Sequence, residues 1–194
     1  MAARLTRPGT RPGRRAGRIL AAVLAAACAG CGAAPATTSP ATTPGGSVVV
    51  VPAEPGLTAA EATTVTLLRR SLATGGFQLS PVNQPVQPAV PSVFATTPVV
   101  VYRIELADPD QGYILIYDFP APSGAAAAAG ALATFVGSGF GQTTYPLDAE
   151  FSVASLGADV VFAWWSPGRA SDPAVTQAAM HLVAAVGTAV PVTK

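Results

Sequence analysis

The sequence has few of the residues that carry most enzyme and metal chemistry. Its 194 residues include only two cysteines, Cys28 and Cys31, and a single histidine, His181. Because no cysteine follows Cys31, the chain beyond it can form no disulfide, thiolate metal site or cysteine nucleophile. One imidazole without a thiolate also excludes a zinc site of the usual composition. We therefore expect no metal, no cofactor and no catalytic residue in the folded domain.

Charged residues are scarce as well, at 11% of the chain, and the two signs are separated along it. Six arginines precede residue 19, whereas the chain after Cys31 carries five basic and ten acidic residues, a net charge of −5. A mildly acidic body with scattered cations lacks the basic patch with which proteins bind nucleic acid. We therefore exclude nucleic acid as a partner and assign the arginines to a targeting segment.

The N-terminus has the order of an export signal. An apolar run of eleven residues, 19–29, follows the arginines. A helix of that length spans about 16 Å, too short for a bilayer core of about 30 Å, so the run is typical of a signal peptide. It leads into Ala29-Gly30-Cys31, which resembles the lipobox of bacterial lipoproteins. Cys28 departs from that motif, because it stands where Leu or Val is usual.

The resemblance to bacterial lipoproteins implies removal of residues 1–30 and lipidation of Cys31, with Cys28 as the alternative site. The protein would then be extracytoplasmic and held at the bacterial cell membrane by its acyl chains, each stabilised by about 0.8 kcal/mol per buried CH₂. Plain secretion after signal cleavage is the alternative. Residues 31–56, rich in Ala, Thr and Pro, are expected to form a disordered tether. Residues 57–194 are expected to form a single domain.

The domain is expected to begin with a helix and to be of the α+β class. Thr58 and Glu61 have the spacing of a capping box, and Val65, Leu68 and Leu72 recur on one helical face. Beyond this helix, two ββα units are predicted at about 99–137 and 146–187, because the pattern of strand, turn, strand and helix repeats after 47 residues. This spacing suggests a duplicated fold with a pseudo-twofold axis.

The burial pattern predicts an order for the strands. Apart from Asp118, residues 113–119 and 160–165 are apolar on both faces, which places them in the middle of a sheet, whereas the first strand of each unit is apolar on one face. We predict a four-stranded antiparallel sheet with helices over one face. The second face also needs a cover, and the N-terminal helix with the Pro-rich crossing, a partner chain and a ligand are all candidates. The predicted strand order is 99–106, 113–119, 160–166, 150–155.

The candidate binding residues are aromatic, with one acid among them. Trp164 and Trp165 are neighbours in a strand, so they point to opposite faces and only one can enter the helix-side core. Asp118 is the one charge in the two central strands. The aromatic side chains could pack in a core on both faces of the sheet, or the second face could carry an aromatic binding surface. The candidate surface consists of Trp164, Trp165, Tyr113, Tyr117, Tyr145 and Asp118.

Other motifs favour structural roles. The spacing Asp108-x-Asp110-x-Gly112 is similar to the opening of a calcium loop, but the twelfth position is Phe119, so a hairpin turn is predicted. The glycine-rich residues 137–141 follow a helix and lack the lysine of a phosphate loop, so a helix exit is predicted.

Catalysis by a serine nucleophile finds no support. The sequence has no G-x-S-x-G elbow. His181 lies away from the helical stripe expected to be buried, and it should therefore face solvent. That stripe comprises Val175, Ala179, Leu182 and Val186.

Together these patterns favour a cell-envelope lipoprotein whose domain is a non-catalytic module that binds a small ligand or a protein partner. The alternative is a structural or assembly lipoprotein that uses the second sheet face as an interface, either in a homodimer or in an envelope complex. An enzyme is the least favoured of the three classes.

Overall fold

The computed structural model describes residues 56–83 and 88–194. Cys28, Cys31 and the tether up to residue 55 lie outside this part. The described elements, in chain order, are α1 (Ala59–Ala73), β1 (Leu79–Pro81), η1 (Ser92–Phe94, a 3-10 turn), β2 (Val99–Ile104), β3 (Tyr113–Asp118), α2 (Pro122–Gly137), α3 (Gly139–Thr143), β4 (Glu150–Leu156), β5 (Asp159–Trp165), η2 (Pro167–Arg169, a 3-10 turn), α4 (Pro173–Ala184) and β6 (Thr188–Ala189).

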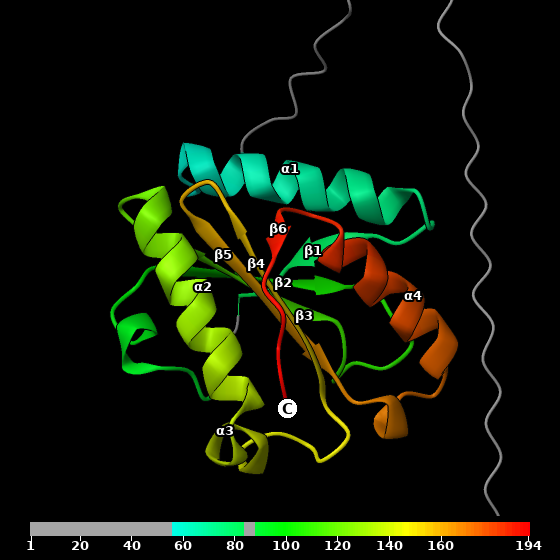
Figure 1. Ribbon diagram of the computed structural model, residues 1–194. Coiled ribbons are helices and arrows are strands. Elements are labelled where there is room, and N and C mark those ends of the chain that lie inside the picture. The colour runs from blue at the N-terminus through cyan, green and yellow to red at the C-terminus, as the bar shows by residue number, and fades with distance from the viewer. Residues whose placement is uncertain (1–55, 84–87) are drawn as a thin grey trace, which may run out of the picture. The chain divides into compact units, whose positions relative to one another are not determined.

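In the described part of the chain, six strands form one antiparallel sheet in the order β1-β2-β3-β5-β4-β6 (Figure 1). The α+β class is confirmed, and the four expected strands occupy the middle in the expected order. The prediction of only four strands was wrong, because β1 and β6 pair at the edges. These edge strands have three and two residues, too few to leave an alternation in the sequence.

Helix α1 is stabilised at its start by the expected capping box. The Thr58 hydroxyl accepts a hydrogen bond from the Glu61 amide (3.2 Å), and the Glu61 carboxylate accepts one from the Thr58 amide (2.7 Å). Val65, Leu68 and Leu72 are at most 2% exposed, which confirms the predicted buried stripe. Helix α4 is capped in a similar way, since the Asp172 carboxylate accepts from the amide of Val175.

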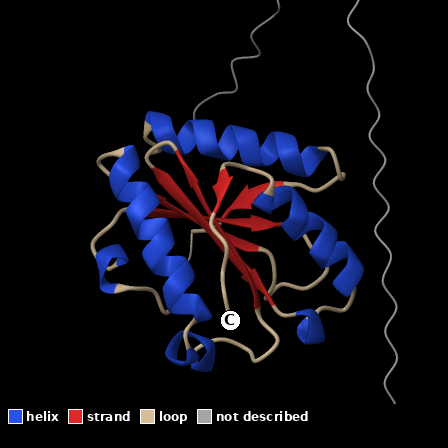
Figure 2. Ribbon diagram, in the orientation of Figure 1, coloured by secondary structure: helices blue, strands red, loops and turns tan. Residues whose placement is uncertain are grey.

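The helices cover both faces of the sheet, which corrects the expectation that they cover one (Figure 2). Parallel strands β3 and β4 are joined through α2, and parallel strands β5 and β6 through α4. Both crossovers move toward the β6 edge, but they start from strands that run in opposite directions. Because such crossovers share one hand, they must place their helices on opposite faces.

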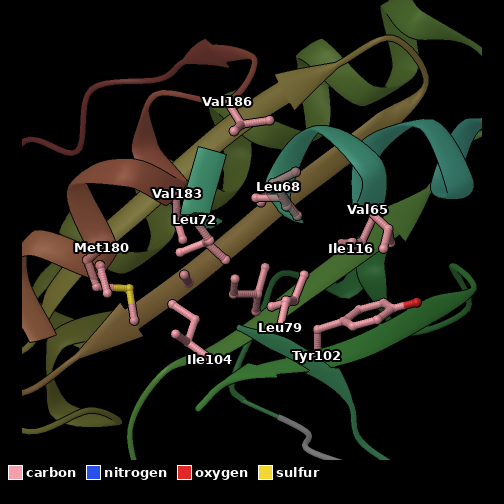
Figure 3. Packing of buried hydrophobic residues seen from close by; sticks show 14 of the residues in the cluster. Val65, Leu68, Leu72, Leu79, Tyr102, Ile104, Ile116, Met180, Val183 and Val186 are labelled. Atoms are coloured by element: carbon pink, nitrogen blue, oxygen red, sulfur yellow. The ribbon is translucent and has the colours of Figure 1, made fainter. Parts of the chain in front are cut away.

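Each face therefore has its own core. On the face covered by α1 and α4, here called the α1 face, apolar side chains from both helices meet those of the strands (Figure 3). On the other face, here called the α2 face, α2, Phe94 of η1 and the C-terminal segment with Val190 and Val192 pack on the sheet. The chain itself thus covers the second face that the sequence left open.

The 47-residue repeat is visible only in the central strand pair. Leu115 of β3 pairs with Phe162 of β5, its counterpart 47 residues later. The hairpins differ, since β4 and β5 are joined by a two-residue turn whereas the β2–β3 connection is much longer. A twofold axis through the central pair would also put α2 and α4 on the same face, and they lie on opposite faces.

Candidate functional site

The two tryptophans point to opposite faces, as predicted. Trp165 is 7% exposed and packs in the core of the α1 face. Trp164 is only partly buried and lies on the α2 face, where its ring contacts that of Tyr145 edge-on, with the centroids 5.4 Å apart. By strand alternation, Tyr113 shares this face and is also partly exposed. Trp164 and Tyr113 therefore remain candidates for a surface, whereas Trp165 is a core residue.

Tyr117 and Tyr145 belong to the core of the α2 face. The Tyr117 ring lies 4.6 Å from that of Phe94, and burial raises the pKa of Tyr117 to about 12. The Tyr145 hydroxyl donates to the carbonyl of Ala89 (2.7 Å), and burial raises the pKa of this phenol still further. Both phenols are neutral and structural.

Trp164 lines a cleft of about 210 Å³ at the end of the sheet where β3 begins and β5 ends. The cleft combines one aromatic side chain with acidic, amide and guanidinium groups. Gln111 is 3% exposed, whereas Asp110 and Arg169 are exposed at the surface. Its lining consists of Asp108, Pro109, Asp110, Gln111, Trp164 and Arg169.

Side-chain hydrogen bonds join the loops that form this cleft. The Gln111 amide oxygen accepts from the backbone amide of Ser166 (3.1 Å), and its nitrogen donates more weakly to the carbonyl of Ser166 (3.4 Å). The Asp108 carboxylate accepts from the hydroxyl (2.5 Å) and amide (2.9 Å) of Ser171. These bonds connect the β2–β3 loop to the segment around η2, so the cleft is formed by residues held in place before any ligand arrives.

A second acid supports the cleft from behind η2. The Asp148 carboxylate accepts from the Ser166 hydroxyl (2.6 Å) and from the Gly168 amide (2.6 Å). These two hydrogen bonds, and more weakly the charge of Arg169, lower the pKa of Asp148; the bonds from Ser171 lower that of Asp108. Both carboxylates are therefore ionised at neutral pH. Neither pairing could be predicted from the sequence, because the partners are far apart along the chain.

Asp118 lies at the opposite end of the sheet from Trp164. It ends β3 and pairs across the strands with Asp159, the first residue of β5. Asp159 has no exposed surface, and Thr64 of α1 donates a hydrogen bond of 2.5 Å to its Oδ2. Burial, and secondarily the nearby carboxylates of Asp118 and Glu61, raise the pKa of Asp159 to about 6. Asp118 therefore does not join the aromatic candidates.

Asp118 also borders a cleft of about 460 Å³ formed beside η1, with Val93, Thr97 and Phe119 among its lining residues. Its side chain, however, alternates with those of Tyr117 and Phe119, both of which belong to the α2 face. The Asp118 carboxylate is thus directed toward α1 and Asp159. The side chains that wall this second cleft are apolar or threonine. Strand alternation directs no charged side chain into it.

The remaining candidates have structural positions. His181 is exposed on α4, as expected. The segment from Asp108 to Gly112 connects β2 to β3, and across residues 56–83 and 88–194 no group of His, Cys, Asp or Glu is placed to hold a metal ion. Residues 137–141 were predicted as a helix exit; they include the start of α3, with Ser138 as its N-cap.

No helix among residues 56–83 and 88–194 is long and apolar enough to cross a membrane.

Comparison with protein-family models, with curated proteins and with solved structures finds no match for this chain.

Proposed function

We propose that this chain is a cell-envelope lipoprotein, anchored by lipid on Cys31, whose domain is a non-catalytic module that binds a small ligand in the Trp164 cleft. The observation that supports the binding role is the cleft itself, with its indole ring beside Gln111 and Arg169. Concave sites that combine an aromatic wall with a few fixed polar groups are the usual form of small-molecule sites.

The lining of the cleft favours a small polar ligand with one apolar face. The indole of Trp164 offers a flat apolar surface, while Arg169 donates hydrogen bonds and Asp110 accepts them. A volume of about 210 Å³ is below the range of about 300–1,000 Å³ of drug-sized ligands, so we favour a ligand of monosaccharide or amino-acid size. The cleft carries both charge signs, which suits a ligand with donors as well as acceptors.

A protein interface is the second candidate, and exposed apolar side chains favour it. Leu147 is 98% exposed and Phe140 is 72% exposed, and both lie between α2 and β4 in the chain. This surface differs from the one that the sequence suggested, because α2 and η1 already cover the second sheet face. A homodimer or an envelope partner would therefore contact the α3 region.

The two indole N–H groups give a direct test of the ligand proposal. The mature protein is titrated with a panel of monosaccharides and amino acids while the indole signals are followed by NMR. We expect the Trp164 signal to shift with at least one compound, whereas the Trp165 signal, from the core of the opposite face, stays in place. The proposal fails if no compound moves Trp164, or if both signals move equally.

A further inference from the structure

Three carboxyl groups interact electrostatically where α1 packs on the sheet. Asp118 and Asp159 are cross-strand partners at the end of β3 and the start of β5. Both belong, by strand alternation, to the α1 face, and Glu61 and Thr64 approach them from the first two turns of α1. These contacts therefore join α1 to two strands, β3 and β5, that are far from it in sequence.

The hydrogen bonds of Asp159 are incomplete when its carboxyl group is ionised. Oδ2 accepts from the Thr64 hydroxyl, but Oδ1 is buried and has no partner among the residues described. An unpaired buried carboxylate oxygen is costly, and one proton shared with Asp118 would satisfy it. The Glu61 carboxylate is engaged elsewhere through Oε2, which accepts from the Thr58 amide.

The charges around Asp159 make ionisation still less favourable. The groups that act on it electrostatically are Asp118 from β3 and Glu61 from α1, and both are negative. A metal ion is not a substitute for the proton, since the described acids do not form a metal-binding group. Two carboxylates held this close favour a state in which one of them is protonated.

Among the residues that the structure describes, no cation acts on Asp159 from the other neighbouring elements. Helix α2 has no titratable side chain, and Glu150 of β4 pairs with Trp165 at the far end of β5. On α4, His181 is exposed. Farther along α1, Arg69 lies over the Tyr102 ring at 5.8 Å and Arg70 is exposed.

We propose that Asp118 and Asp159 share one proton in the folded protein, and that this proton fastens α1 to the sheet so that the helix undocks more readily as the pH rises. In acid, the shared proton bridges the two carboxyl groups and leaves the pair with a single negative charge. When the proton leaves to solvent, two negative charges face each other and Glu61 beneath α1. Undocking the helix then weakens the repulsion between the carboxylates and exposes them to water.

The sign and size of the effect follow from the raised pKa of Asp159, about 6 against an ordinary 3.8. The docked state binds the proton more tightly than the undocked state, so the opening constant of α1 rises with pH between these values and then levels off. Between pH 4 and pH 8 the expected rise is roughly 50-fold.

The test combines two measurements on the mature protein from pH 4 to pH 8. Carboxyl carbon NMR follows the titration of Asp118 and Asp159, and amide hydrogen exchange, corrected for intrinsic rates, follows the opening of α1. We expect a carboxyl titration near pH 6 and a loss of α1 protection over the same range. In Asp159→Asn the pH-dependent loss of α1 protection should disappear. Asp110→Asn alters an exposed acid of the Trp164 cleft and should leave that pH-dependent loss unchanged.

Other results overturn the proposal. If both aspartates titrate at or below pH 4 in the unaltered protein, no proton is shared. If one titrates near pH 6 while α1 protection stays constant, the proton does not fasten the helix. Because these readouts come from the unaltered chain, the conclusion stands even if Asp159→Asn fails to fold, and Asp118→Asn provides a second variant. None of the outcomes depends on a ligand in the Trp164 cleft.

Discussion

Replacing Asp159 with Asn should remove a pH dependence from the free energy of unfolding. In the folded protein, burial raises the pKa of Asp159 from 3.8 to about 6. A raised pKa means that the folded state binds the proton more tightly, so the stabilisation is complete below pH 3.8 and is lost as the pH rises to about 6. The difference between these two pKa values corresponds to about 3 kcal/mol. Between pH 4 and pH 7 the unaltered protein should lose about 2 kcal/mol relative to the Asn variant, because part of the stabilisation is already lost by pH 4.

The assay is urea unfolding of both proteins at several pH values, compared as a difference. The difference is needed because hydrogen bonds lower the pKa of Asp108 and Asp148, and those groups make the protein more stable as the pH rises through their range. Both proteins retain them, so their contribution cancels. A difference in unfolding free energy that stays constant from pH 4 to pH 7 would refute the reasoning about Asp159.

The remaining predictions concern the anchor and the C-terminal segment. Replacing Cys31 with Ser should abolish incorporation of labelled fatty acid, whereas Cys28→Ser should retain it; the reverse pattern would move the lipid to Cys28. Replacing Gly137 with Ala should destabilise the domain by about 1–3 kcal/mol in urea unfolding, because a Cβ there would overlap the carbonyl oxygen of Thr193. Gly130→Ala, in the same helix with open space around it, should instead stabilise by about 0.5–1 kcal/mol; equal effects at both sites would contradict this packing.

The sequence predicted those parts of the fold that depend on local patterns. The capping box at Thr58 and Glu61 has a fixed spacing, and it forms as expected. The order of the four middle strands followed from which strands are apolar on both faces. The faces of the helices did not follow, because they depend on the direction of each crossover and not on any residue in the helices.

The buried stripe of α4 was predicted only in part, since Ala179 and Val186 are buried as expected but Val175 and Leu182 are not. Val175 is 43% exposed, whereas Thr176 is 2% exposed and Met180 is fully buried. The helix consists largely of small and apolar residues, so hydrophobicity alone does not distinguish neighbouring stripes. The expected exposure of His181 was confirmed, because it lies outside either stripe.

The acid pair shows why the site could be predicted only in part. Asp118 was conspicuous as the charge in an apolar strand. Asp159 was not, because it follows Gly157 and Ala158 and its sequence is typical of a turn. The two-residue turn instead makes it the first residue of β5 and places it opposite Asp118. Such a pairing is decided by strand register, which the sequence of either strand does not contain.

The most direct test of the binding role is native mass spectrometry of the mature protein, exported in a bacterium and released gently from detergent. We expect a monomer that carries, beyond its lipid, one discrete extra mass. Arg169→Ala should lose this mass, whereas Arg70→Ala, at an exposed position of α1, should keep it. A bare monomer, or a dimer without any added mass, would contradict a small-molecule module and favour a protein partner at the α3 region.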